Sequence, residues 1–322
     1  MCVTGMHRSG TSLAARALHL LGVSLGDPEQ LMRPGPDNPA GYWELRSVKE
    51  LDDELLAHLG GAWDQPPVLE PGWEHDDALA PFRERARSVL DEAFARTVPT
   101  VAGWKDPRLS LLLPFWRTVT PVATTIVLVR DPDEVAASLA RRNRIEAPHA
   151  ALLWLRYLFA AVANDPGHLL VRHRDFFDDL PSTLSAIARH LDLPAPDADV
   201  EAAVREHLDP ALRHHVAPAQ RAAEHNPLVE LAALVWDGGS VDLDAVPGPV
   251  AVGLARGWLR APLDTEALAR ARAEVVELKE RLRKRTRERM AAALHEQAQE
   301  HAQDQEQAEG AASPRDASGR PA

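Results

Sequence analysis

The chain has 322 residues, a formal net charge of −12 at pH 7 and a single cysteine, Cys2. The acidic balance argues against a nucleic-acid partner, and one cysteine excludes an intrachain disulfide and argues against a structural zinc site. No apolar run reaches the ~20 residues that a membrane-spanning helix needs, so we expect no transmembrane segment. Because Met1 leads straight into a loop motif, we expect a cytoplasmic protein. We also expect no bound metal.

The first predicted elements are a short strand over residues 1–4 and a helix over residues 12–21 that Gly22 ends. Between them lies the loop GMHRSGTS, residues 5–12, which has the spacing of a phosphate-binding loop. In such a loop, backbone N–H groups and the N-terminus of the following helix bind phosphate oxygens. This part of the chain is therefore predicted to bind an anion.

The residue types in the loop indicate which anion. Thr11 stands where loops that bind nucleoside triphosphates carry the lysine that reaches the β- and γ-phosphates. The cation lies instead at Arg8, whose guanidinium suits a bidentate contact with a terminal anionic group. Ser9, Thr11 and Ser12 add hydroxyl donors. We therefore expect an anion other than MgATP.

Glu44 is the next candidate. It follows a loop rich in Pro, Gly and Asn, residues 33–41, and precedes a predicted helix over residues 45–59. Its carboxylate is a candidate general base, with His7 as the alternative. The competing interpretation of Glu44 is an ordinary acidic residue at a helix N-terminus.

Lys105 lies in the segment GWKDPR, residues 103–108, after a short strand predicted over residues 100–103. Open α/β sheets bind ligands at the carboxyl ends of their strands, where a lysine can stabilise developing negative charge. Alternatively, Lys105 pairs with Asp106 at a turn. Arg108 is either an acceptor contact or part of the scaffold.

The segment TTIVLVRDPDEVAASLARR, residues 124–142, predicts a buried parallel strand over residues 125–129 and a helix that begins near Asp131 and Pro132. Arg130 then stands at the carboxyl end of a strand, and Ser138 lies two turns into the helix. A further strand is predicted over residues 169–173, followed by an acidic turn and a helix. Strands alternating with helices predict an α/β fold with a central parallel sheet.

At these residues the chain resembles the sulfotransferases that use 3′-phosphoadenosine 5′-phosphosulfate (PAPS). In that family a loop like residues 5–12 holds the 5′-phosphosulfate, and an Arg and a Ser with the spacing of Arg130 and Ser138 bind the 3′-phosphate. The resemblance covers roughly the first two-thirds of the chain. It implies a P-loop NTPase-like three-layer fold, PAPS as co-substrate, and in-line transfer of a sulfuryl group to a hydroxyl of a carbohydrate, glycolipid or small-molecule acceptor.

The resemblance also implies roles for individual residues. Lys105 would contact the sulfuryl group and the leaving oxygen, Glu44 would take the acceptor's proton, and Arg130 and Ser138 would bind the 3′-phosphate. The phosphosulfate would be held by Arg8, Ser9, Gly10, Thr11 and Ser12, with Arg8 also stabilising the transferred group. Two alternatives stay open: a P-loop small-molecule kinase that binds MgATP, and a non-catalytic nucleotide-binding scaffold protein.

The domain organisation is predicted as a sulfotransferase-like α/β domain over residues 1–225, followed by a small extension or lid over residues 226–262. A charged helix over residues 263–300 comes next, with dense Lys and Arg around residues 279–289. That helix is either solvated, or used for self-association or for contact with an anionic partner. Residues 301–322 are predicted to be a disordered tail. The apolar positions of the helix span barely two heptads, which argues against a stable coiled coil.

Overall fold

The structure is a computed structural model that describes residues 1–35, 38, 41–96, 101–208, 226–237 and 240–241. All of these belong to one compact unit, Met1–Leu268. The second unit, Ala269–Ala322, lies outside the described residues, as do the predicted charged helix and tail. Within the described part of the chain, no helix is both long and apolar enough to cross a bilayer.

A parallel sheet of four strands forms the centre of the fold. The strands are β1 (Cys2–Gly5), β2 (Trp104–Lys105), β3 (Thr125–Val129) and β4 (Leu169–Arg172), in the spatial order β2-β1-β3-β4. Val3 in β1 is flanked by Lys105 and Ile126. Because the chain crosses from one side of β1 to the other, the carboxyl end of β1 lies at a topological switch point, where open α/β sheets bind ligands.

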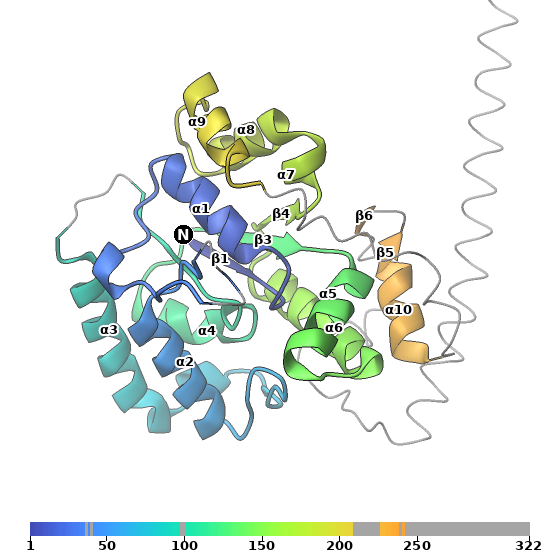
Figure 1. Ribbon diagram of the computed structural model, residues 1–322. Coiled ribbons are helices and arrows are strands. Elements are labelled where there is room, and N and C mark those ends of the chain that lie inside the picture. Colours follow the sequence, from blue (N-terminus) through green and yellow to red (C-terminus); the bar gives the residue numbers. More distant parts are fainter. Residues whose placement is uncertain (36–37, 39–40, 97–100, 209–225, 238–239, 242–322) are drawn as a thin grey trace, which may run out of the picture. The chain divides into compact units, whose positions relative to one another are not determined.

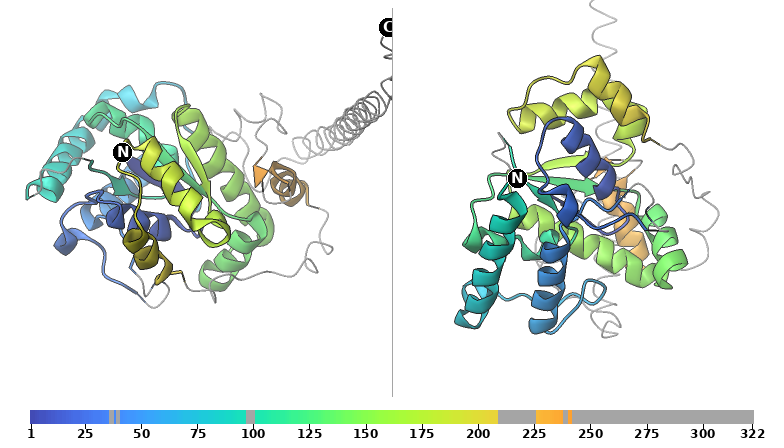
Figure 2. Two further views of the ribbon diagram at one scale, coloured as in Figure 1. Left: turned by 90° about the horizontal axis from the view of Figure 1, so that it is seen from above. Right: turned by 60° about the vertical axis from the view of Figure 1, so that its left-hand side comes forward.

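Helices cover both faces of the sheet (Figure 1). One face carries α1 (Thr11–Leu20), α7 (Asp175–Asp178), α8 (Leu180–His190) and α9 (Ala198–Arg205), which bury an apolar core against β1, β3 and β4. The other face carries α4 (Leu109–Val119), α5 (Pro132–Asn143) and α6 (Ala147–Asn164). The two views of Figure 2 show the sheet between these helix layers, which confirms the predicted three-layer fold.

Outside the layers, α2 (Arg46–His58) packs on α3 (Ala80–Phe94), and α10 (Pro227–Val235) packs on α6. Short 3₁₀ helices occupy Pro28–Gln30, Trp73–His75 and Asp77–Leu79. After α10, β5 (Trp236–Asp237) pairs antiparallel with β6 (Ser240–Val241). These last elements are the described part of the predicted extension over residues 226–262.

Most predicted elements are confirmed to within a residue or two. Gly22 ends α1 with a φ of 89°, a conformation that glycine adopts without strain. The strand predicted over residues 100–103 is wrong, because the chain pairs with β1 only at Trp104 and Lys105. Gly103 instead approaches the Met1 backbone so closely that an added Cβ would lie 2.4 Å from its carbonyl oxygen. Lys105 therefore lies within a strand rather than after one.

Candidate functional site

The loop between β1 and α1 is shaped by its two glycines. An added Cβ on Gly5 would lie 2.2 Å from the Leu128 carbonyl oxygen, and one on Gly10 would lie 2.3 Å from the His173 ring. Gly10 is the N-cap of α1 and has a φ of 90°. Because glycine has no side chain to cap the helix, the first-turn N–H groups of α1 are left for another acceptor.

The donors of this loop fit an anion. Ser9 is 1% exposed, and its hydroxyl forms no hydrogen bond with any described residue. Leaving a buried hydroxyl unsatisfied costs about 1–3 kcal/mol, so a ligand oxygen at this place would offset that cost. Thr11, also buried, begins α1. The loop therefore offers an anion a buried hydroxyl and the backbone N–H groups at the start of α1.

Arg8 joins the two predicted phosphate motifs. Its Nε donates a hydrogen bond of 2.9 Å to Ser138 Oγ, although the two residues are 130 positions apart in the sequence. The Arg8 carbonyl oxygen accepts a 3.5 Å contact from Arg130 Nη1. Arg8 has a φ of 71°, which is strained for a residue other than glycine. The structure thus brings Arg8, Arg130 and Ser138 together at the carboxyl ends of β1 and β3.

Glu44 and Lys105 meet beside the start of α1. Lys105 Nζ lies 2.5 Å from Glu44 Oε1, and both side chains are buried, with 3% and 10% of their surface exposed. Lys105 Nζ also donates to the Tyr42 carbonyl oxygen at 3.3 Å and lies 3.5 Å from Ser12 Oγ. Lys105 therefore pairs with Glu44 rather than with Asp106 at the turn. The Glu44 carboxylate, the Lys105 ammonium group and the Ser12 hydroxyl therefore lie close together.

The segment before α2 is anchored to the loop. Ser12 Oγ donates to the Tyr42 carbonyl oxygen at 3.1 Å, and Asn38 Nδ2 donates to Ser12 Oγ at 3.1 Å. Glu44 precedes Leu45, the N-cap residue of α2, whose backbone is extended there. These contacts hold the Glu44 backbone next to the loop, in the place where the sequence predicted the general base.

Arg130 borders a second hollow. Its Nε donates to Glu134 Oε2 at 2.6 Å, one turn along α5. A cavity of about 300 Å³ is lined by Arg130, Asp131, Glu134, His173, Arg174, Phe177 and Trp236. The Trp236 indole donates to Asp131 Oδ2 at 2.9 Å, which ties the segment after α10 to the start of α5. The rings suit an aromatic ligand, and the charged lining consists of two arginines, Arg130 and Arg174, and two carboxylates, Asp131 and Glu134.

His173 lies at the junction of the loop and this cavity and was not identified from the sequence. It follows β4, is 8% exposed, and its backbone N–H donates to the Val129 carbonyl oxygen at 2.7 Å. Burial, with a further contribution from the Arg130 charge, lowers the pKa of His173 to about 3. The ring is therefore neutral at pH 7.

Because the folded protein keeps the His173 ring neutral, we expect the free energy of unfolding to decrease as the pH falls. In the unfolded chain His173 takes up a proton below pH 6.5, its ordinary pKa, whereas in the folded chain it does so only near pH 3. The unfolding free energy that the neutral ring contributes above pH 6.5 is therefore lost as the pH falls from 6.5 to 3. Between pH 7 and pH 5 we expect the His173→Gln variant to lose about 2 kcal/mol less unfolding free energy than the wild type. Urea denaturation at both pH values, in buffers without phosphate or sulfate, measures the difference. Equal losses would show that His173 does not titrate in this way.

His7 lies on the other side of the loop. Its ring centroid is 4.4 Å from that of Trp63 and 5.8 Å from that of Tyr157. Burial, followed by the charges of Arg108 and Lys105, holds the pKa of His7 well below its ordinary value. The His7 ring is therefore neutral at pH 7 and packs against Trp63 and Tyr157.

Behind Lys105 lies a buried charged cluster that the sequence analysis left ambiguous. Arg108 Nε lies 2.5 Å from Asp53 Oδ1, and Arg108 Nη1 lies 3.0 Å from Asp106 Oδ1. Burial raises the pKa of Asp106, although Arg108 opposes the shift. These ion pairs assign Arg108 to the scaffold that fixes the turn after β2. The cluster joins α2 to that turn, a contact between residues too far apart for local spacing to reveal.

Among the described residues, no group of three or more His, Cys, Asp and Glu side chains could hold a metal ion. Four of the predicted site residues are charged, namely Arg8, Glu44, Lys105 and Arg130, and all lie at the carboxyl edge of the sheet or in the loops beside it. In this arrangement the loop before α1 has the Glu44–Lys105 ion pair at one end and Arg130 with its aromatic neighbours at the other.

Comparisons with solved structures gave distant similarities. The sulfotransferase STF9 from Mycobacterium avium is 16% identical, with a TM-score of 0.41 over 67% of this chain and 68% of that chain. STF1 from Mycobacterium tuberculosis H37Rv is 18% identical, with a TM-score of 0.44 over 64% of this chain and 70% of that chain. The sulfotransferase domain from the Synechococcus PCC 7002 olefin synthase is 18% identical, with a TM-score of 0.38 over 80% of this chain and 94% of that chain.

No curated protein matches the sequence. The sequence model of the sulfotransferase family, in contrast, matches residues 1–197, from β1 and the phosphate loop through α8. This match spans more than half of the chain and contains Arg8, Glu44, Lys105, Arg130 and Ser138. The chain therefore belongs to the sulfotransferase family.

Proposed function

We propose that the protein transfers the sulfuryl group of PAPS to a hydroxyl of a carbohydrate, glycolipid or small-molecule acceptor. The observation that carries this proposal is the hydrogen bond from Arg8 Nε to Ser138 Oγ. It unites the loop proposed for the phosphosulfate with the helix proposed for the 3′-phosphate. A donor with a 3′-phosphate needs both anion sites close together, whereas MgATP needs the lysine that Thr11 replaces.

In this proposal the loop binds the donor. Ser9 and Thr11 donate hydrogen bonds to the oxygens of the 5′-phosphosulfate through their hydroxyls, and Gly10 and Ser12 donate through their backbone N–H groups, since the Ser12 hydroxyl donates to the Tyr42 carbonyl oxygen. The Arg8 guanidinium adds positive charge. Arg130 and Ser138 bind the 3′-phosphate. The unsatisfied Ser9 hydroxyl and the uncapped start of α1 support this assignment. The cavity lined by Arg130, Phe177 and Trp236 has room for part of the nucleoside.

The chemical step uses the pair at the other end of the loop. Glu44 accepts the proton of the acceptor hydroxyl, and the acceptor oxygen forms its bond to sulfur. The bond from sulfur to the bridging oxygen of the 5′-phosphate breaks on the opposite side, and adenosine 3′,5′-bisphosphate leaves with the bonding electrons. Lys105, 3.5 Å from Ser12 Oγ in the described structure, stabilises the charge that develops on the leaving oxygen.

Transfer of radioactive label tests the proposal. The full chain is incubated with [³⁵S]PAPS and a panel of sugars, glycolipids and phenols, with EDTA present, and the organic products are separated from free sulfate. We expect label on at least one acceptor, and no phosphate label when [γ-³²P]ATP and Mg²⁺ replace PAPS. Phosphate transfer without sulfuryl transfer would favour the kinase alternative. Bisphosphate binding with no transfer to any acceptor would favour the scaffold alternative.

A further inference from the structure

A separate cavity of about 830 Å³ lies between the loop that follows α2 and the first half of α6. Its volume falls in the range of about 300–1,000 Å³ that small-molecule sites occupy. Polar and apolar atoms line it in about equal measure, and Leu59, Val68, Leu152 and Leu153 are among the apolar lining residues. None of the residues proposed for the donor or for proton transfer lines it.

The buried charge in this cavity is a cation. Arg156 lines the cavity although only 3% of its surface is exposed, and its Nη2 donates to the Pro67 carbonyl oxygen at 3.0 Å. Burial lowers the pKa of Arg156 to about 9, which leaves the guanidinium charged at neutral pH. A charge removed from water in this way interacts strongly with an oxyanion that reaches it.

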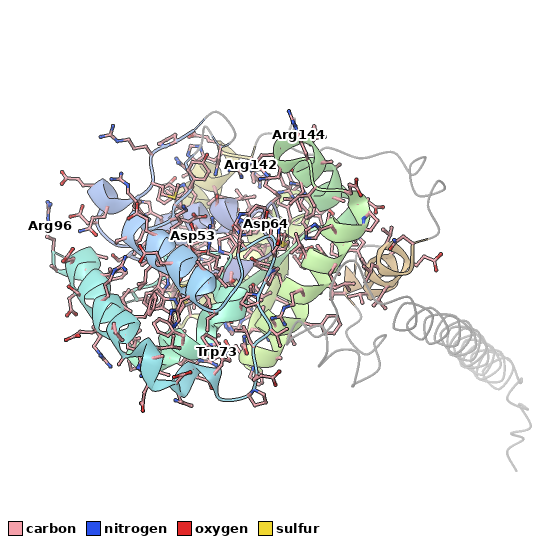
Figure 3. The ribbon with its side chains drawn as sticks, turned by 90° about the horizontal axis from the view of Figure 1, so that it is seen from below. Asp53, Asp64, Trp73, Arg96, Arg142 and Arg144 are labelled. Atoms are coloured by element: carbon pink, nitrogen blue, oxygen red, sulfur yellow. The ribbon has the colours of Figure 1, made fainter. Side chains whose placement is uncertain are left out.

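The other charged group of the wall is more exposed. Asp64, on the loop after α2 (Figure 3), is half-buried, so solvent screens its carboxylate more than it screens Arg156. The Asp64 carbonyl oxygen accepts a hydrogen bond of 2.7 Å from His149 Nε2, which attaches the loop to α6. The cavity therefore combines a cluster of apolar side chains, a buried cation and a carboxylate nearer to water.

We propose that this cavity binds an amphipathic organic anion, with its apolar body against Leu152, Leu153 and Val68 and its oxyanion paired with Arg156. The site is distinct from the proposed donor site, but the loops that border the two sites touch each other. Trp63, in the wall segment, contacts the His7 ring, and its carbonyl oxygen accepts a 2.8 Å hydrogen bond from the Tyr157 hydroxyl. The proposal does not depend on PAPS being the donor.

Calorimetric titration of the full chain with decanoate, below its micellar concentration, tests the site, with decanol as the uncharged probe of equal chain length. We expect decanoate to bind at least about tenfold more tightly than decanol, the factor that one charge-assisted hydrogen bond contributes. Arg156→Met should remove this preference and Arg156→Lys should keep part of it. Arg205→Met, which removes an exposed arginine of α9, should change neither affinity.

A second variant keeps the test decisive if Arg156→Met fails to fold. Ala57 is an exposed residue of α2 that lines the cavity, so Ala57→Trp fills the space from its rim without disturbing the core. Loss of decanoate binding in Ala57→Trp, with an unchanged midpoint of urea denaturation, supports the site. Equal binding of decanol and decanoate, unchanged binding in Ala57→Trp, or no binding of decanoate would overturn the proposal. Because no turnover is measured, its failure is separate from any failure of the sulfotransfer assay.

Discussion

Glu44→Gln is expected to lower kcat by about 10²- to 10⁴-fold, the usual contribution of general acid–base catalysis, while adenosine 3′,5′-bisphosphate still binds. The amide keeps the shape of the side chain and a hydrogen-bond acceptor but cannot take a proton from the acceptor hydroxyl. The measurement is kcat from sulfuryl transfer, alongside calorimetric titration of the same variant with the bisphosphate.

Glu44 forms a buried ion pair with Lys105, so Glu44→Gln also affects stability and needs controls for folding. Removing one member of a buried pair costs up to about 3–5 kcal/mol, so Glu44→Gln is expected to unfold at lower urea concentration. Retained bisphosphate affinity shows that the site has nevertheless formed. The matched control is Glu54→Gln in α2, the helix that follows Glu44, since Glu54 is exposed and pairs with Arg85 at the surface. Normal turnover in Glu44→Gln would remove this carboxylate from the mechanism.

Arg130→Ala is expected to weaken binding of adenosine 3′,5′-bisphosphate by about 10- to 100-fold, the range for a lost charge-assisted hydrogen bond. Affinity for adenosine 5′-monophosphate, which lacks the 3′-phosphate, should stay nearly constant. The measurement is the ratio of the two dissociation constants by calorimetry. Arg141→Ala, an exposed arginine in the last turn of α5, is the matched control and should leave the ratio unchanged.

Glu134 provides a sharper test of the same assignment. Arg130 pairs with Glu134 at 2.6 Å, so Arg130→Ala also leaves a carboxylate free to repel the ligand. In the double variant Arg130→Ala with Glu134→Ala that repulsion is gone. We expect the preference for the 3′-phosphate to stay lost. Its full recovery in the double variant would mean that Arg130 only neutralises Glu134.

The local parts of the fold could be predicted because their signals are contiguous. The run of β-branched residues gave β3 at its observed bounds, and Asp131 caps α5 through a 2.9 Å hydrogen bond from the Asp133 N–H. Strand β2 was misplaced because a two-residue strand has little pattern of its own. Its position follows from pairing with β1, which is a tertiary contact.

The arrangement of the candidate site could be predicted only in outline. The sequence motifs identified Arg8, Glu44 and Lys105 as candidate site residues. The predicted parallel sheet explains why residues at the carboxyl ends of different strands lie at the same edge. The bond from Arg8 to Ser138 and the ion pairs of Arg108 join distant segments, so no local period signals them. His173 was missed because its environment depends on the closeness of Gly10 and on the charge of Arg130, which come from two other parts of the chain.

The most direct test of the central claim is calorimetric titration of the wild-type chain with adenosine 3′,5′-bisphosphate, with ADP and MgATP as comparators. A donor site built from the loop, Arg130 and Ser138 predicts tight binding of the bisphosphate and much weaker binding of ADP. The 3′-phosphate distinguishes these two ligands at the end of the site that Arg130 occupies. Preference for MgATP, or equal affinity for ADP and the bisphosphate, would contradict PAPS as the donor.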